Sequence, residues 1–369
     1  MFGIAMSNLF QEKGRLLISV GGVAFSVLLI MVLQGLYQGW SNKIGEYIRT
    51  IPADYWVMQS GAEDMFHTPS VLPLEAEQEI AAIAGVGSVK PFNGRRVVVD
   101  FEDRAVGMYV VAYDATRDTG KPARVTDGKA TPSPGEIIVD RVAARTNGIG
   151  LGDTLTVAGQ ALRVAGLSEG GDIVAFSFAF ADKQDAEKIQ RLPGSANFFL
   201  VQVKDGFDKS AVAQEIKDRV ANVDVVTRQK FVANNTKLIS DNFLPVILVL
   251  LVIGIAVGIA VIGLTIFTST IEKTREYGVL KAIGMRNGAL YVVVVEQALA
   301  AGVLGYVLGA SLALVLQATL GEVVPQFVSQ IQPVDIAWIF ILTMGMAIVA
   351  AYLPMRRIAH IDPAEVFKA

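Results

Sequence analysis

The chain has no cysteine among its 369 residues and only two histidines, His67 and His360. The absence of cysteine excludes disulfides, thiolate metal sites and a thiol nucleophile. No P-loop (Gly-x-x-x-x-Gly-Lys-Ser/Thr) and no His-Glu-x-x-His zinc motif occurs. The net charge of −3 favours neither nucleic acid nor a strongly acidic partner. We therefore expect no metal, cofactor or nucleic acid to be bound by this chain.

A serine nucleophile is the one catalytic pattern that the residues offer. The segment 166–170 (Gly-Leu-Ser-Glu-Gly) matches the nucleophile elbow, which requires a strand, a sharp turn and then a helix. The residues that follow it, 171–174, have the pattern of another strand, and His67 lies in a loop before a proline. The sequence therefore predicts a binding or transducing protein and not an enzyme.

Charged residues are also missing from four long apolar segments: Leu16–Asn42, Phe243–Ile271, Gln297–Gly321 and Ile336–Met355. A helix needs about 20 apolar residues to cross the hydrocarbon core of a bilayer, and each segment reaches that length. A long, more polar stretch separates the first segment from the second. The predicted fold is an α-helical membrane protein with four transmembrane helices in a one-plus-three order and a mixed α/β extracytoplasmic domain.

The predicted organisation follows from these segments. It comprises an N-terminal segment 1–15, transmembrane helices at 16–42, 242–271, 289–317 and 336–355, an external domain 43–241 with candidate lobes 43–130 and 131–228, a cytoplasmic loop 272–288, an external loop 318–335 and a tail 356–369.

The short loops determine the expected orientation. Lys13 and Arg15 precede the first apolar segment, the loop 272–288 holds four Lys and Arg residues, and the loop 322–335 holds none. The positive-inside rule places the basic loops in the cytoplasm. We therefore expect a plasma (inner) membrane protein with both termini cytoplasmic and residues 43–241 periplasmic or extracellular.

The residue pattern of the external domain predicts alternating strands and helices. The clearest predictions are a hairpin of strands at 97–101 and 105–113, a helix at 73–83, a strand at 173–180 and further short elements up to 226. In the strand at 173–180, Phe176, Phe178 and Phe180 lie on one face, which favours either a sandwich core or a lipophilic substrate cleft.

A long helix is expected to begin at Arg228. No glycine or proline intervenes before Pro245, so this helix is predicted to continue into the second apolar segment. A continuous helix can carry motion across the bilayer. A flexible joint at Asn234–Asn235 is the alternative.

The cytoplasmic loop contains a short amphipathic pattern. Tyr277, Leu280 and Gly284 recur three and four residues apart, as on one face of a helix. Such a helix either lies on lipid headgroups or docks in a groove of a cytoplasmic partner. Both interpretations fit the residues alone.

The loop and the tail together resemble a known family. Residues 275–284 read Arg-Glu-Tyr-Gly-Val-Leu-Lys-Ala-Ile-Gly, and residues 354–365 contain a Pro-x-Arg-Arg…Asp-Pro-x-Glu pattern. Both are similar to signatures of MacB/FtsX-like (type VII) ABC transporter permeases, and residues 7–15 resemble the amphipathic N-terminal helix of that family. The resemblance assigns ATPase coupling to Arg275, Glu276, Tyr277, Gly278, Val279, Leu280, Lys281 and Gly284.

The resemblance implies a mechanism and partners. Such permeases form homodimers, and each copy binds an ABC ATPase subunit that carries ATP and Mg²⁺. Closure of the ATPases moves the external domains (mechanotransmission), which exports or extracts a hydrophobic or amphipathic substrate, in some members with a periplasmic adaptor or outer-membrane factor. Without a fused ATPase, this chain resembles separate-subunit members such as DevC-type and haem-exporter permeases, with a MacB periplasmic core-like domain.

Two other functions stay open at this stage. One is an FtsX-like signalling permease that regulates a cell-wall hydrolase without transport, and the other is a membrane-tethered binding module without an ATPase. Within the spans, Glu296 is a candidate functional carboxylate, because an intramembrane charge is costly, although it can also reach the headgroups or pair with a nearby cation. The glycines of the second and third spans are expected to allow close helix packing within one chain.

Overall fold

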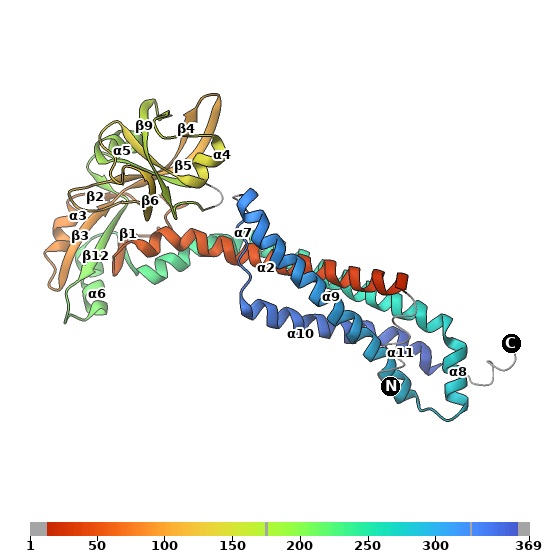
Figure 1. Ribbon diagram of the computed structural model, residues 1–369. Coiled ribbons are helices and arrows are strands. Elements are labelled where there is room, and N and C mark those ends of the chain that lie inside the picture. The colour runs from red at the N-terminus through yellow and green to blue at the C-terminus, as the bar shows by residue number, and fades with distance from the viewer. Residues whose placement is uncertain (1–12, 174–175, 325–326, 361–369) are drawn as a thin grey trace. The chain divides into compact units, whose positions relative to one another are not determined.

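The structure is a computed structural model that describes residues 13–173, 176–324 and 327–360 (Figure 1). The chain divides into two compact units. We call residues 1–39 and 242–369 the helical unit and residues 40–241 the α/β domain. The chain passes between the units twice, once inside helix α2 (Lys13–Thr50) and once inside helix α7 (Arg228–Glu272). Both connections between the units are therefore helical.

The helical unit contains the predicted apolar helices. Among the described residues, four helices are long and apolar enough to cross a membrane, at Lys13–Thr50, Ser240–Glu272, Asn287–Gly321 and Pro333–Ala359. The one-plus-three order expected from the sequence is confirmed. In the part of the chain that the structure describes, the helices of this unit that follow α7 are α8 (Thr274–Ala282), α9 (Asn287–Val323), α10 (Pro333–Ala350) and α11 (Tyr352–Ala359). The helix predicted from residues 7–15 and the end of the tail pattern, 361–365, lie largely outside the described residues.

Glycines allow α9 to approach α2 closely. A Cβ atom added to Gly305 would lie 2.4 Å from Val23 Cβ, and one added to Gly309 would lie 2.5 Å from the carbonyl oxygen of Ala24. In lipid, such close backbone approach supplies the van der Waals contact that holds helices together. The predicted use of these glycines for packing within one chain is confirmed.

A loop also packs against α2 through glycine. Gly35 accepts a hydrogen bond from the backbone N–H of Gln330 at 2.9 Å, and a Cβ added to Gly39 would lie 1.8 Å from the carbonyl oxygen of Val328. The side-chain oxygen of Gln317 in α9 accepts from the backbone N–H of Ile331 at 3.1 Å. The segment 327–332 is thus held against two helices by backbone contacts.

Gly39→Ala is expected to destabilise the helical unit, whereas Gly21→Ala in the same helix is expected to stabilise it. A helical glycine replaced by alanine gains about 0.5–1 kcal/mol, and Gly21 has no atom within 4 Å of the added Cβ. At Gly39 the added Cβ meets backbone, and overpacking costs about 1–3 kcal/mol. Thermal unfolding in lipid nanodiscs measures both, and equal stabilisation of the two variants would contradict the packing of Val328 on Gly39.

The described residues of the α/β domain form three sheets. Their strand orders are β13-β1-β12-β3, β6-β9-β7-β10-β5-β4-β8 and β11-β2. The strands are β1 (Tyr55–Gln59), β2 (Leu72–Pro73), β3 (Val86–Phe92), β4 (Gly94–Phe101), β5 (Arg104–Tyr113), β6 (Arg124–Gly128), β7 (Glu136–Asp140), β8 (Thr154–Val157), β9 (Gln160–Glu169), β10 (Ser177–Asp182), β11 (Ser195–Ala196), β12 (Phe198–Val203) and β13 (Val223–Thr227). The helices are α3 (Ala76–Ala81), α4 (Arg141–Asn147), α5 (Lys183–Gln190) and α6 (Lys209–Arg219).

Each of the two large sheets buries one face against helices. In the four-stranded sheet, Val57 and Val201 share a core with Ile80 of α3 and Ile216 of α6. A second core joins strands of the seven-stranded sheet to α4 and α5. Because side chains alternate along a strand, the residues between these core positions point to the opposite face of each sheet.

The sequence halves 43–130 and 131–228 do not form two lobes. The seven-stranded sheet takes β4, β5 and β6 from the first half and β7 to β10 from the second, and β10 pairs in parallel with β5. The four-stranded sheet combines strands from the two ends of the domain. Residues 129–135, at the expected boundary, connect β6 to β7, which are two strands of the same sheet.

Several boundaries also differ from prediction. The strand expected at 173–180 begins only at Ser177, and the helix expected from Pro73 is α3, since Leu72–Pro73 pairs as β2 with β11. Strand β3 was not predicted, because it contains Gly87, Ser88 and Pro91 and lacks apolar alternation. Proline is tolerated there because β3 is the edge strand of its sheet.

Candidate functional site

Helix α8 lies in the segment where sequence predicts an ATPase contact. Its exposed residues are Arg275, Glu276, Val279, Ala282 and, directly after the helix, Ile283, which is 74% exposed; we call these five residues the outer face of α8. Their spacing of one, three and four residues places them on one side of a helix. The outer face combines an apolar centre with charges of both signs.

The opposite face of α8 is part of the core. Tyr277 is only 3% exposed and belongs to the hydrophobic core of the helical unit, and Gly278 is buried. Leu280 is half-buried against the same core. The prediction that Tyr277, Leu280 and Gly284 share one helical face needs correction: Tyr277 and Leu280 pack inward, while Gly284 is exposed with a φ of +98°, past the end of the helix.

Lys281 connects the two sequence patterns that resembled a family. Its Nζ donates to the carbonyl oxygen of Ile358 at 2.7 Å and to that of Ala359 at 3.3 Å, at the C-terminal end of α11. The last carbonyls of a helix have no partner within the helix, and a cation there also complements the helix dipole. Lys281 therefore joins α8 to the helix that begins the tail pattern.

The start of α2 and the end of α7 are also joined. Arg15 forms an ion pair with Glu272. Glu272 is the last residue of α7 and stands two residues before α8 begins. Three helices that the sequence places at the cytoplasmic side therefore end or begin close to α8.

At their other ends, α2 and α7 are anchored in the α/β domain by aromatic rings. Tyr47 of α2 packs its ring 4.6 Å from Phe178 and 6.4 Å from Phe92, so it contacts both large sheets. Phe231 of α7 stacks on Trp56, with ring centroids 4.3 Å apart. All five side chains are fully buried. The two helices thus contribute to the core of the domain.

Polar contacts strengthen the anchoring of α7. The side-chain oxygen of Asn235 accepts from the backbone N–H of Met65 at 2.9 Å, and Asn234 Nδ2 donates to the carbonyl oxygen of Glu63 at 2.9 Å. Both asparagines lie inside α7, which is continuous from Arg228. The prediction of a continuous helix is confirmed, and the alternative of a flexible joint at these residues is wrong.

The three phenylalanines predicted to face substrate are placed differently. Phe178 and Phe180 are fully buried and stacked at 6.4 Å, so they occupy the sandwich core. Phe176 precedes β10, is half-buried and has the guanidinium of Arg96 5.1 Å from its ring centroid. The sandwich-core interpretation therefore applies to Phe178 and Phe180. As buried rings, these two do not line a substrate cleft.

Glu296 and Ser168 are two further candidate functional groups. Glu296 is half-buried in α9, and its Oε2 has no hydrogen-bond partner among the described residues. Ser168, the centre of the nucleophile-elbow pattern, lies inside strand β9 and is fully buried, without the helix that the pattern requires. Within the described residues, no group of three or more His, Asp or Glu side chains is arranged to hold a metal ion.

The carboxyl of buried Asp140 holds the residues that follow β9 in place. Burial raises the pKa of its carboxyl to about 6, although it accepts from the backbone N–H of Val142 at 2.8 Å and of Gly171 at 3.0 Å. These bonds cap α4 and tie it to the residues after β9. Asp140 therefore has a structural role.

Ala282 and Ile283 belong to the outer face but were not among the residues predicted from the sequence to contact an ATPase. Their spacing from Val279, three and four residues, was a usable signal. Apolar periodicity alone does not tell which side of a short helix packs inward. The inward position of Tyr277 depends on contacts with distant helices, among them the buried Ile358 of α11.

Four apolar helices, a large α/β domain after the first of them and a short helix between the second and third define a membrane permease, and comparison with known proteins identifies its family. Residues 16–219 match the MacB-like periplasmic core domain, and residues 248–363 match the C-terminal domain of FtsX-like permeases. The first match covers more than half of the chain. The chain belongs to the MacB/FtsX-like family of ABC transporter permeases.

Individual relatives are distant, and the share of this chain that they cover differs. An uncharacterized ABC transporter permease of Mycobacterium tuberculosis is 24% identical over 100% of this chain and 99% of its own length. A putative hemin transport system permease protein, HrtB of Staphylococcus haemolyticus, is 20% identical over 91% of each chain. The periplasmic region of MacB from Actinobacillus actinomycetemcomitans covers 54% of this chain and 98% of its own, at 13% identity and a TM-score of 0.38.

Proposed function

We propose that this chain is the permease subunit of an ABC transporter that works by mechanotransmission. In this proposal a separate ATPase subunit binds ATP and Mg²⁺ and docks on the outer face of α8 in the cytoplasm. The α/β domain lies outside the plasma membrane, and its movement exports or extracts a hydrophobic or amphipathic substrate. Two copies of the permease form the working unit.

One observation carries the proposal: both connections between the units are continuous helices with a defined contact at each end. Within the α/β domain, Tyr47 and Phe231 bind α2 and α7 into the aromatic core. Within the helical unit, Arg15 and Glu272 join the other ends of the same helices next to α8. Helices with satisfied backbone hydrogen bonds transmit a displacement, whereas loops absorb it.

The placement of α8 supports an ATPase contact there. The inward face is held by Tyr277 and by the bonds from Lys281 to α11, so a force on α8 reaches other helices of the unit. The outer face offers Val279 and Ile283 as apolar anchors with Arg275 and Glu276 beside them. Helix-in-groove recognition uses this pattern. The name of the hemin-transport relative supports an amphipathic substrate.

The test uses the absence of cysteine. Val98→Cys places a single spin label on an exposed residue (59%) of β4 in each copy of the full chain. The labelled permease is co-expressed with each ABC ATPase of the source organism that lacks a membrane domain, and the complex is reconstituted in nanodiscs. ATP with vanadate is expected to shift the distance distribution between the two labels.

Two samples provide the controls for this shift. One contains an ATPase variant that lacks its catalytic glutamate, and the other contains no nucleotide. An unchanged distribution in the presence of hydrolysing ATPase would contradict mechanotransmission. Failure of every such ATPase to bind would instead support the membrane-tethered module.

A further inference from the structure

A pocket opens on the α/β domain where four segments of that domain meet. Its floor is formed by residues on strands β3 and β12, one side by the end of α2 and the residues after it, and the other side by the loop 118–123. The space between these residues measures about 550 Å³, with open solvent at the mouth included. Its lining includes Ile51, Lys90, Lys121, Pro122, Leu200 and Gln202.

The floor belongs to one face of the four-stranded sheet. Lys90 of β3 lies directly opposite Leu200 of β12, and Ser88 lies opposite Gln202. Ser88 Oγ donates to Gln202 Oε1 at 3.0 Å, and Gln202 Nε2 donates to the carbonyl oxygen of Pro52 at 2.8 Å. The polar side chains of Ser88 and Gln202 are therefore already hydrogen-bonded within the domain.

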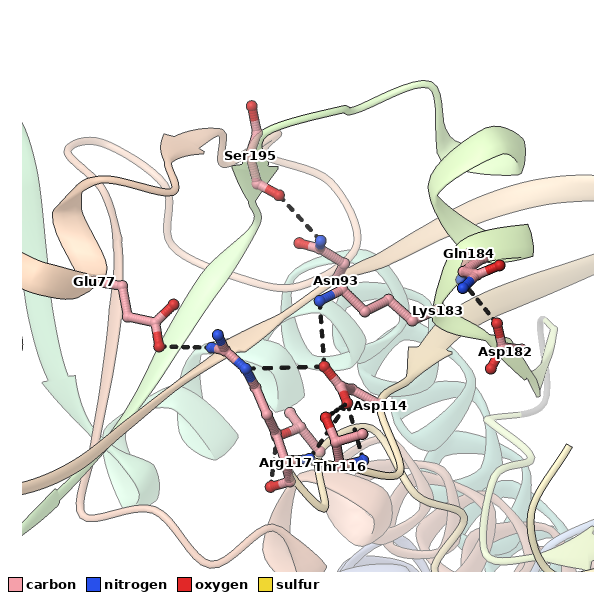
Figure 2. Close-up of polar contacts among 10 residues, drawn as sticks. Glu77, Asn93, Asp114, Thr116, Arg117, Asp182, Lys183, Gln184 and Ser195 are labelled. Carbon is pink, nitrogen blue, oxygen red and sulfur yellow. Dashed lines mark hydrogen bonds and ion pairs between the residues drawn. The ribbon is translucent and has the colours of Figure 1, made fainter. Parts of the chain in front are cut away.

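The loop side of the pocket is held in place by Asp114 (Figure 2). Its carboxyl accepts from the backbone N–H of Thr116 at 3.0 Å and from Lys183 Nζ at 3.2 Å, and Arg117 Nη1 bonds Glu77 at 2.6 Å. Burial opposes ionisation of Asp114, but the hydrogen bonds from Thr116 and Lys183 outweigh it and keep the pKa of Asp114 below its usual range.

The same loop turns sharply at Gly120. Gly120 has a φ of +72°, and a Cβ added there would lie 2.1 Å from the carbonyl oxygen of Ala112. The hydroxyl of Tyr47 donates to the carbonyl oxygen of Lys121 at 3.2 Å. The wall of the pocket is thus preorganised, which lowers the entropic cost of binding a ligand.

The charges in the pocket are unequal. Lys121 pairs with Asp118 at 3.0 Å, whereas Lys90 is half-buried and forms no ion pair or hydrogen bond with any residue that the structure describes. Leu200, which lies directly opposite Lys90, and Ile51 also line the pocket and are apolar. The pocket therefore offers an uncompensated ammonium group next to an apolar surface.

We propose that this pocket binds a small anionic amphiphile, with its acidic group at Lys90 and its apolar part against Ile51, Pro122 and Leu200. Charge-assisted hydrogen bonds to an anion are the strong interaction available to an ammonium group, and the apolar walls favour a ligand with a short hydrocarbon portion. The pocket lies wholly within the α/β domain, so this proposal does not depend on an ATPase partner.

The test is calorimetric titration of the full chain in nanodiscs of neutral phosphatidylcholine, with hexyl phosphate as the probe and empty nanodiscs as the blank. Saturable binding is expected. Lys90→Gln is expected to weaken it about tenfold, the effect of losing one charge-assisted hydrogen bond. Lys204→Gln, at an exposed lysine after β12 that does not line the pocket, is expected to leave affinity unchanged. Lys90→Arg is expected to restore most of it.

Other probes separate the sources of binding. Inorganic phosphate is expected to bind much more weakly than hexyl phosphate, and hexyltrimethylammonium is expected not to bind. Hexanoate in place of hexyl phosphate distinguishes carboxylate from phosphate ligands, and binding of either acid supports the proposal. No saturable binding of either acid, equal binding of inorganic phosphate, or unchanged affinity in Lys90→Gln with an unaltered unfolding temperature would overturn it.

Discussion

Lys237→Pro is expected to abolish the ATP-driven change in distance between labels on the α/β domains while leaving the ATPase bound. Proline removes a backbone donor and clashes with the carbonyl four residues earlier, which costs a helix about 3 kcal/mol or more. Lys237 is exposed and lies in α7 between the anchor at Asn235 and the point where the chain leaves the domain, after residue 241. A break there interrupts the connection without touching α8.

The measurement is the label-distance experiment on Val98→Cys, with ATPase activity recorded on the same sample. Lys237→Ala is the matched control, because it keeps the helix and removes only an exposed ion pair with Asp241 at 4.0 Å, worth little. Pro245 already lies within α7, but in the helical unit, beyond the position under test. An undiminished distance change in Lys237→Pro would show that α7 does not carry the motion.

Much of the architecture could be predicted because its signals are local. Charge-free runs of 20 residues or more predict spans, since a single charge in hydrocarbon is expensive. The hairpin β4–β5 was predicted from strand-like runs on each side of a polar turn, and the continuous α7 was predicted from the absence of breakers. In each case the deciding information lies within one segment.

The pairing of strands could not be predicted in the same way. The four-stranded sheet joins β1 to β12 and β13, which are separated from it by more than 130 residues. No residue pattern within β1 specifies these partners, because register is determined by burial of a whole face. The lobe boundary at 130 was wrong for this reason.

The candidate site illustrates the same limit. The segment 275–284 was located by its resemblance to a family signature, and its helical form was predicted from the spacing of its apolar residues. Which side of α8 is available depends on α11, which follows it by about 70 residues and receives the bonds of Lys281. The pocket at Lys90 was likewise invisible in the sequence, because β3, β12 and the loop 118–123 meet only after folding.

A further expected result concerns the outer face of α8: Ile283→Glu is expected to weaken ATPase association about 30-fold or more. Loss of an apolar anchor at the centre of an interface costs about 2 kcal/mol or more, and a buried unpaired carboxylate adds to that cost. Ile283 is 74% exposed in the single chain, so the substitution leaves the fold of the permease intact. Val279→Glu is expected to act in the same direction.

Association is measured by titrating the ATPase against labelled permease in nanodiscs. Leu151→Glu is the matched control, since it places the same charge on another exposed apolar residue of the α/β domain and leaves the label site at residue 98 unchanged. Tyr277→Ala separates the two faces of α8: it is expected to lower the unfolding temperature of the permease, because Tyr277 is buried in the core. Unchanged association in Ile283→Glu, combined with loss of association in a stably folded Tyr277→Ala, would place the docking contact on the inward face and require α8 to detach from α11 before the ATPase binds.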